Sequence, residues 1–150
     1  MKYAERTNVP VERSKGELER LLRRYGAEGY GTIWKAGVGT IVRFQIAGRP
    51  IQMKLASPVV SEKTPSGRRR SPDQVEIAFE QAERQSWRAL LLIIQAKLEA
   101  IESKIASLDE EFLPYILLAG GETVADRMVP QIEAAIRGEQ LPALLPKEGL

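Results

Sequence analysis

Residues 89–94 are six consecutive apolar residues in the middle of a longer stretch with helical periodicity. In a helix, six residues make more than one and a half turns, so their side chains point in every direction. Exposing such a helix to water forfeits the hydrophobic stabilisation on every side. We therefore expect this helix to be buried all round, between a sheet and a further element that is either the C-terminal helix or a second subunit.

The sequence also indicates where this central helix begins. Ser71 is a favourable N-cap, Pro72 suits the first helical position because its missing N–H costs nothing there, and Gln74 lies three residues after the cap. The helix is expected to run from residue 71 to about residue 107. Its apolar stripe is expected to comprise Val75, Phe79, Ala82, Leu90, Ile94, Ile101, Ile105 and Leu108.

An earlier helix is predicted over about residues 15–25. The segment Ser14-Lys15-Gly16-Glu17 has the form of a capping box, in which Ser14 and Glu17 each satisfy a backbone amide. Gly26 suits the left-handed conformation that follows a helix. The buried side is expected to comprise Leu18, Leu21, Leu22 and Tyr25, and the exposed side Arg13, Arg20, Arg23 and Arg24.

Between the two helices, residues 29–56 change to alternating polarity and contain two turn signals. This pattern predicts a three-stranded antiparallel meander with Arg43 and Lys54 on its polar face. The first strand leaves two alternatives open, because either Ile33 or the pair Tyr30 and Trp34 points inward. The expected apolar face comprises Val42, Phe44, Ile46, Ile51, Met53 and Leu55.

Further signals divide the C-terminal third. Residues 107–110 repeat the capping-box pattern and predict a short helix. Residues 115–118 are expected to form a short strand, and a last helix to end at Gly138, with Pro130 starting or kinking it. Residues 139–150 are rich in proline and are expected to form an extended tail. The buried side of the last helix is expected to comprise Val124, Met128, Ile132 and Ile136.

Together these segments predict a single α+β domain over residues 1–150. Its order is an N-terminal helix, a three-stranded antiparallel meander, a long helix, a short strand and a C-terminal helix. A length of 150 residues is usual for one domain. Residues 57–70 lack periodicity, end in three arginines and are expected to form a flexible basic loop.

The composition excludes several kinds of active site. The chain contains no cysteine and no histidine. This removes thiolate zinc sites, Cys nucleophiles and the imidazole that is the usual general base and zinc ligand near neutral pH. The acidic residues 76, 80 and 83 are best explained as a solvated helix face, and residues 109–111 as acids that favour a helix N-terminus. We therefore predict a protein that is not an enzyme, with no catalytic residue, metal site or cofactor.

Charge is distributed unevenly along the chain. Residues 1–70 contain 15 basic and 6 acidic residues, whereas residues 71–150 contain 7 basic and 14 acidic ones. A basic half favours an anionic partner, although two oppositely charged halves also neutralise each other across a fold. Three arginines beside a helix N-terminus are the strongest candidates for phosphate contacts. The predicted nucleic-acid-binding residues are Arg68, Arg69, Arg70, Arg20, Arg23, Arg24, Arg43, Lys54 and Trp34, the last as a base-stacking side chain on the outer sheet face.

The order helix, three strands, helix, strand is similar to the core of PD-(D/E)xK nucleases. Those enzymes bind a divalent metal through carboxylates on the second and third strands, whereas here the second strand has none and the third reads Gln52-Met53-Lys54. The same meander between two helices is similar to double-stranded-RNA-binding domains, which place basic residues where Arg68 to Arg70 fall. Both comparisons favour binding over catalysis.

Six segments of the chain together resemble other known sequences: Met1 to Ala27, Arg70-Ser71-Pro72, Ser86 to Leu90, Lys97 to Ala100, Glu110 to Phe112 and Pro142 to Pro146. Through these segments the sequence resembles, over nearly its whole length, a group of small, uncharacterised proteins of phages and prophages. The resemblance implies a mobile-element setting, in which DNA replication, recombination or counter-defence are the natural roles.

We therefore expect a nucleic-acid-binding accessory protein of a phage or mobile element. The chain starts with charged residues rather than a signal peptide and has no run near the roughly 18 apolar residues of a spanning helix, so the cytoplasm of a bacterial host is the expected location. The alternative is a protein–protein adaptor or inhibitor that acts through the long helix and the Pro-rich tail. The apolar run also predicts a homodimer through the long helix.

Overall fold

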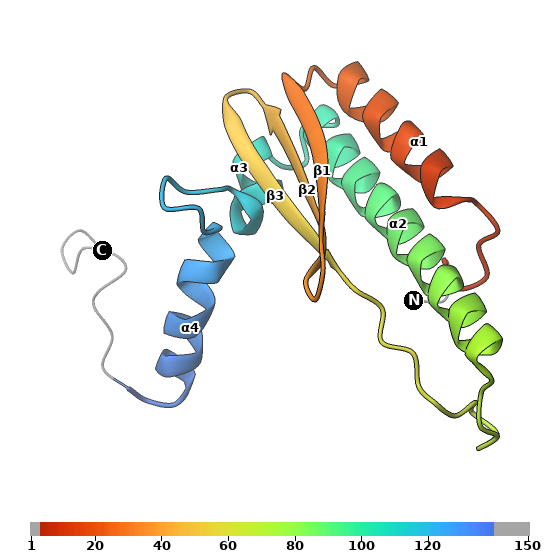
Figure 1. Ribbon diagram of the computed structural model, residues 1–150. Helices are drawn as coiled ribbons and strands as arrows, with labels where there is room; N and C mark the ends of the chain where they lie inside the picture. The colour runs from red at the N-terminus through yellow and green to blue at the C-terminus, as the bar shows by residue number, and fades with distance from the viewer. Residues whose placement is uncertain (1–3, 140–150) are drawn as a thin grey trace.

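The computed structural model describes residues 4–139 and has an α+β fold, as the sequence predicts (Figure 1). Its helices and the three strands of the sheet follow one another in the expected order. None of the helices in this range combines the length and apolarity needed to cross a membrane. The elements are α1 (Val11–Arg24), β1 (Gly29–Lys35), β2 (Gly39–Ile46), β3 (Arg49–Ala56), α2 (Pro72–Glu102), α3 (Leu108–Phe112), the 3₁₀ turn η1 (Leu113–Tyr115) and α4 (Val124–Ile136).

The sheet is the predicted antiparallel meander, with strand order β1-β2-β3. In the register, Tyr30 lies opposite Phe44, which lies opposite Ile51, so all three point to the same face. Trp34 has the same parity as Tyr30 and points to that face too, whereas Ile33 points to the outer face. Of the two alternatives for the first strand, the pair Tyr30 and Trp34 therefore faces the helices and Ile33 does not.

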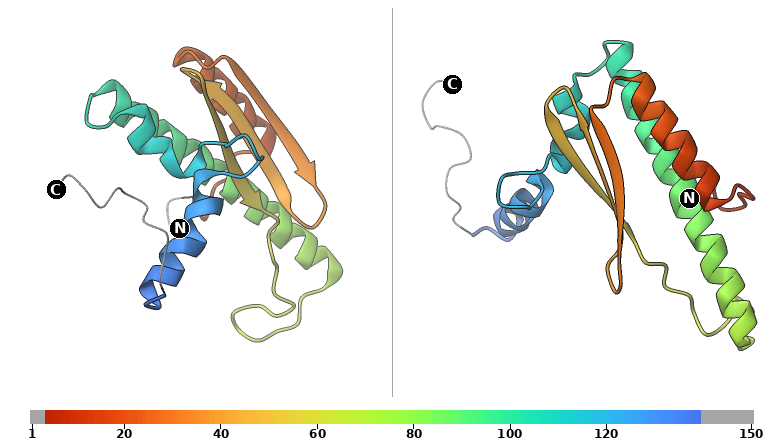
Figure 2. Two further views of the ribbon diagram at one scale, coloured as in Figure 1. Left: turned by 90° about the vertical axis from the view of Figure 1, so that its left-hand side faces the viewer. Right: turned by 45° about the horizontal axis from the view of Figure 1, so that its top comes forward.

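Helices α1 and α2 lie side by side on one face of the sheet, and α4 lies on the other side (Figures 1 and 2). Leu18 and Leu22 of α1 join Leu90, Ile94 and Leu98 of α2 and the apolar sheet face in a single core. Because α2 contributes a buried residue every three or four positions, its central turns run along the core.

The apolar run of residues 89–94 is covered within one chain on most sides, but it is not buried all round as the sequence predicts. Leu91 and Ile94 are buried, whereas Ile93 is 38% exposed. Helix α1 supplies the cover that we expected from the C-terminal helix or from a second subunit. A second copy is therefore not needed to shield this run, and the homodimer through the long helix stays a prediction.

Two helix boundaries differ from prediction. Helix α1 begins at Val11, so Ser14 lies inside the helix, fully buried, and caps nothing. Val11 is partly buried against the core, and this packing favours the extra turn. Helix α2 ends at Glu102, so Ile105 lies beyond it and is 81% exposed.

Helix α3 contributes an aromatic anchor to the core. The side chain of Phe112 is fully buried. Its ring meets the ring of Phe44 edge to face, with 5.7 Å between the ring centroids. Ser107 and Glu110 form the predicted capping box at the start of this helix.

The short strand predicted over residues 115–118 is wrong. The chain there forms η1 and then two isolated bridges, Ile51 with Ile116 and Leu117 with Thr123. Only one residue of this segment pairs with the edge of β3, so it covers that edge without extending the sheet.

The last helix, α4, starts with a capping box of Thr123 and Asp126 and has Pro130 in its interior, so Pro130 does not start it. Its predicted buried side holds only in part, because Val124 and Met128 are half-buried but the second half of the stripe is exposed. Ile132 is 48% exposed and Ile136 79% exposed, while Ala134 is the buried residue of this helix. Most of the α4 surface has no other element against it in the part of the chain that the structure describes. The predicted Pro-rich tail lies, from residue 140 onward, outside the described residues.

Candidate nucleic-acid interface

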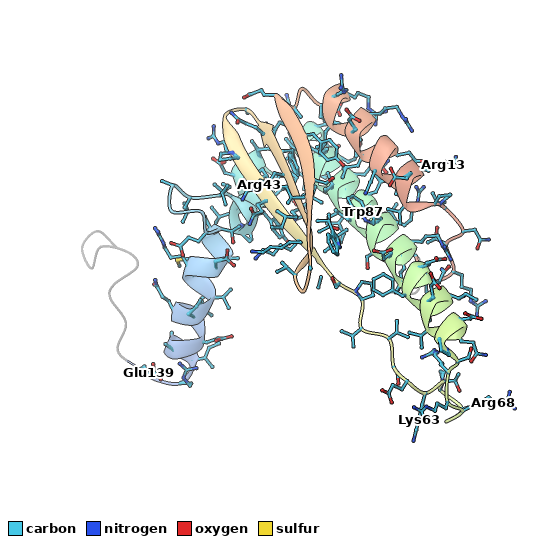
Figure 3. All side chains as sticks on the ribbon, viewed as in Figure 1. Arg13, Arg43, Lys63, Arg68, Trp87 and Glu139 are labelled. Atoms are coloured by element: carbon cyan, nitrogen blue, oxygen red, sulfur yellow. The ribbon has the colours of Figure 1, made fainter. Side chains whose placement is uncertain are left out.

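The predicted binding residues lie on three separate surfaces. Arg68 is near Lys63 at the far end of the chain segment that precedes α2, whereas Arg43 is on the sheet (Figure 3). The arginines of α1 form the third surface, on the other side of the core from Arg43. The fold therefore does not gather the predicted residues into one patch.

The first surface is a hairpin formed by residues 61–70, which we call the basic hairpin. Lys63 and Arg69 form an antiparallel bridge, and the Arg70 amide donates to the Glu62 carbonyl at 2.8 Å. The turn closes where the Thr64 amide donates to the Arg68 carbonyl, also at 2.8 Å. The segment predicted to be a flexible basic loop thus contains hydrogen-bonded structure.

The three arginines of the basic hairpin have different roles. The Arg70 guanidinium donates to the carbonyls of Ser61 and Lys63, at 2.8 and 3.1 Å, and so ties the two strands of the hairpin together. Arg68 and Arg69 are exposed. Among the described residues, neither of them nor Lys63 forms an ion pair. The hairpin therefore presents three free cations and uses the fourth internally.

The N-terminus of α2 adds less to this surface than its position predicts. The Ser71 hydroxyl accepts from the Gln74 amide at 3.2 Å, and the Gln74 side chain accepts from the Ser71 amide at 2.9 Å. This is the predicted capping box, and it occupies amide donors that a phosphate would otherwise use. Asp73 in the first turn also opposes an anion. Anion binding here depends on the hairpin side chains.

The arginines of α1 are exposed but stand among acids. Arg23 donates to Glu19 at 2.9 Å, and Arg13 to Glu17 at 3.2 Å. Arg24 lies against the Tyr25 ring, 5.7 Å from its centroid. Glu17 also accepts from Arg88 of α2 at 2.6 Å, and this hydrogen bond lowers the pKa of Glu17. Of the predicted second basic patch, Arg23 pairs with an acid, whereas Arg20 and Arg24 are exposed and form no ion pair among the described residues.

The two cations of the outer sheet face also interact with neighbouring side chains. The Arg43 side chain donates to Gln52 at 2.7 Å. Gln52 is 5% exposed although it is on the outer face. Lys54 is close enough to Asp126 of α4 for its charge to contribute to the lowered pKa of that carboxyl. Sequence alternation identified the polar face but gave no sign that Gln52 is buried there.

Trp34 does not join this outer face, so its predicted place beside Arg43 and Lys54 is wrong. Its side chain is 69% exposed and lies on the helix side of the sheet. There it lines a cleft with Trp87, Leu55 and Pro58. Alternation alone could not choose its face, because Ile33 offered an equally good inward side chain.

The remaining polar groups bear on the predictions for metal binding and on buried titratable side chains. Within residues 4–139, no three acidic side chains are grouped so as to hold a metal ion. Burial raises the pKa of Tyr30, and its hydroxyl has no hydrogen-bond partner among the described residues. No protein-family model, curated protein or solved structure matches the chain.

Proposed function

We propose that this protein binds nucleic acid through the basic hairpin, with Lys63, Arg68 and Arg69 as phosphate contacts. The observation that carries this proposal is the bridge between Lys63 and Arg69. Residues that pair directly across an antiparallel bridge hold their side chains on one face, and like charges in this position repel. A phosphate group between the two side chains converts this repulsion into attraction.

Two features make the basic hairpin suited to this role. Arg70 holds it together from within, so that little ordering entropy remains to be lost when an anion binds. Because the hairpin lies beyond the end of the core, an extended nucleic acid can approach it without contact with the rest of the fold (Figure 3). Backbone contacts of this kind give affinity and no sequence preference.

Binding to single- and double-stranded DNA and RNA by fluorescence anisotropy at two salt concentrations tests the proposal. The double variant Arg68→Ala/Arg69→Ala should bind more weakly, and the slope of log affinity against log salt should flatten by about 2. Arg70 is left unchanged because it anchors the hairpin. The melting temperature should stay nearly constant, since both side chains are exposed.

The double variant Arg127→Ala/Arg137→Ala on α4 is the matched control. Like the first variant, it removes two positive charges from the protein, but from exposed arginines that already pair with Glu122 and Glu139. Its binding should be close to that of the unmodified protein. Equal weakening by both double variants would indicate an effect of net charge alone, and absence of binding at low salt to any of the four nucleic acids would refute the proposal.

A second candidate function is the protein–protein adaptor or inhibitor. Exposed apolar side chains favour it: Ile77 on the N-terminal part of α2 is 63% exposed, and Ile136 of α4 is 79% exposed. An apolar interface is nearly insensitive to salt, whereas contacts to phosphate weaken steeply as salt rises. The salt series above therefore separates the two functions for any partner that the protein binds.

A further inference from the structure

The free edge of the sheet is strand β1. Among the residues that the structure describes, β1 pairs with β2 alone and stands at the margin of the sheet (Figure 2). The opposite edge, on β3, is partly covered, because Ile51 bridges to Ile116 and the Leu117 amide donates to the Pro50 carbonyl at 2.8 Å. An uncovered edge offers unpaired backbone donors and acceptors to another strand.

Strand β1 also lacks the usual protection against edge pairing. It contains no proline, and its only charged residue, Lys35, is the last one. Two of its large apolar side chains are exposed, Ile33 at 52% and Trp34 at 69%. Edge strands that do not pair with a strand of another chain usually carry a charged residue or a proline near the middle.

The backbone of β1 has a defined orientation toward this edge. The Lys35 carbonyl accepts from the Val38 amide at 3.1 Å, so it points toward β2. Along an antiparallel strand, successive residues direct their backbone groups to opposite sides. Tyr30, Thr32 and Trp34 therefore direct their N–H and C=O groups to the free edge.

The sequence of β1 is complementary to itself about Thr32. With two copies antiparallel and Thr32 opposite Thr32, Tyr30 faces Trp34 of the second copy, and Gly31 faces Ile33. Aromatic pairs across strands are favourable. Nothing lies within 4 Å of the position of a Cβ on Gly31, so the space beside it is open to the large side chain opposite.

We propose that β1 pairs with β1 of a second copy of this chain, antiparallel about Thr32, to form a continuous six-stranded sheet. The pairing satisfies the edge-directed backbone groups of Tyr30, Thr32 and Trp34 in both copies. It also buries part of the exposed Ile33 and Trp34 side chains. This surface differs from the long helix, whose apolar run α1 and the sheet already cover, and it does not depend on the basic hairpin.

Light scattering on the full chain at high micromolar concentration measures the assembly. The unmodified protein should have twice the mass of the 16.7 kDa chain. Thr32→Pro should have the mass of one chain, because it removes an edge-directed N–H without removing a bond to β2. Ile93→Lys, on the exposed side of α2, should leave the mass of two chains unchanged.

Cysteine crosslinking tests the register without relying on a proline variant that folds. The chain has no cysteine, so a single one reports one position. Two Thr32→Cys copies would lie about 5.5 Å apart between Cα atoms, a distance that a disulfide spans, and should crosslink on oxidation. Ile33→Cys is offset from its equivalent and should crosslink far less. A mass of one chain for the unmodified protein, dissociation by Ile93→Lys alone, or equal crosslinking by both cysteine variants would overturn the proposal.

Discussion

The middle of α2 and the helix α4 each carry apolar residues at helical spacing, but the structure covers them to very different extents. In α2, Trp87, Leu90, Leu91, Ile94 and Leu98 are buried. In α4, Ala134 is buried, while Ile132 and Ile136 of the expected stripe are exposed. A stripe with helical spacing thus shows which side of a helix is apolar, but not whether another element covers that side.

The difference follows from how each helix is attached. The central turns of α2 pack against both the sheet and α1, and the three elements share one core. Helix α4 is attached near its start, where the Val124 amide donates to the Ile116 carbonyl at 2.9 Å and Thr123 bridges to Leu117. Beyond that point its stability depends on local interactions, chiefly its capping box.

The largest expected difference between the two helices comes from one substitution made in each. Ile94→Ala in α2 removes a fully buried side chain and should lower the free energy of unfolding by about 2–5 kcal/mol. Ile132→Ala in α4 removes a half-exposed one and should change it by less than about 0.5 kcal/mol. Urea denaturation measures both.

Ile93→Ala is the control, because it makes the same change next to Ile94 on a side chain that is 38% exposed. Its cost should lie between the other two. Equal costs for Ile94→Ala and Ile132→Ala would mean that α4 is covered in solution, and the contrast between the two helices would fail.

A smaller effect on stability distinguishes Thr123, which caps α4, from Ser14, which was predicted to cap α1 but lies inside that helix. Thr123→Ala removes the hydroxyl that accepts from the Asp126 amide at 3.1 Å, and it should cost α4 about 1 kcal/mol. Amide hydrogen exchange over residues 124–136 should then accelerate about fivefold.

Ser14→Ala, at the predicted capping box of α1 that does not form, should leave stability unchanged or raise it slightly. The reason is that the Ser14 hydroxyl is buried and has no hydrogen-bond partner within residues 4–139. A loss of stability in Ser14→Ala as large as that in Thr123→Ala would contradict this.

The smallest effect concerns acid stability. The backbone and side chain of Thr123 hold the pKa of Asp126 below its ordinary value, with a further contribution from Lys54. Because the pKa is lower in the folded state, this carboxylate stabilises α4 above its unfolded pKa of about 3.9, and the stabilisation is lost as pH falls through the folded value. Hydrogen exchange over residues 124–136 in Asp126→Asn should therefore change less between pH 6 and pH 3, relative to the core, than in the unmodified protein. Superimposable pH profiles would exclude this contribution.

Local signals in the sequence predicted the fold class and several element boundaries. The capping boxes at Ser71 and Ser107 are present as predicted, because the hydrogen bonds of a cap join residues that are three positions apart. The alternation of β2 predicted its buried face for the same reason, since neighbouring residues of a strand point to opposite sides. The exposure of Arg68 and Arg69 was also expected from sequence, as part of a basic loop, whereas the bridge between Lys63 and Arg69 was not predicted.

Contacts between distant segments decided the rest. Ser14 is not the N-cap of α1, because burial extended the helix to Val11. The strand register placed Trp34 on the face of the sheet that packs against the helices. The cover of residues 89–94 came from α1, more than sixty positions away in sequence. Each of these outcomes depends on which surfaces meet in three dimensions, and periodicity along one segment carries no information about its neighbours in space. The sequence by itself therefore determined the elements and their apolar sides, and the tertiary structure decided which of those sides are buried and which remain open for a partner.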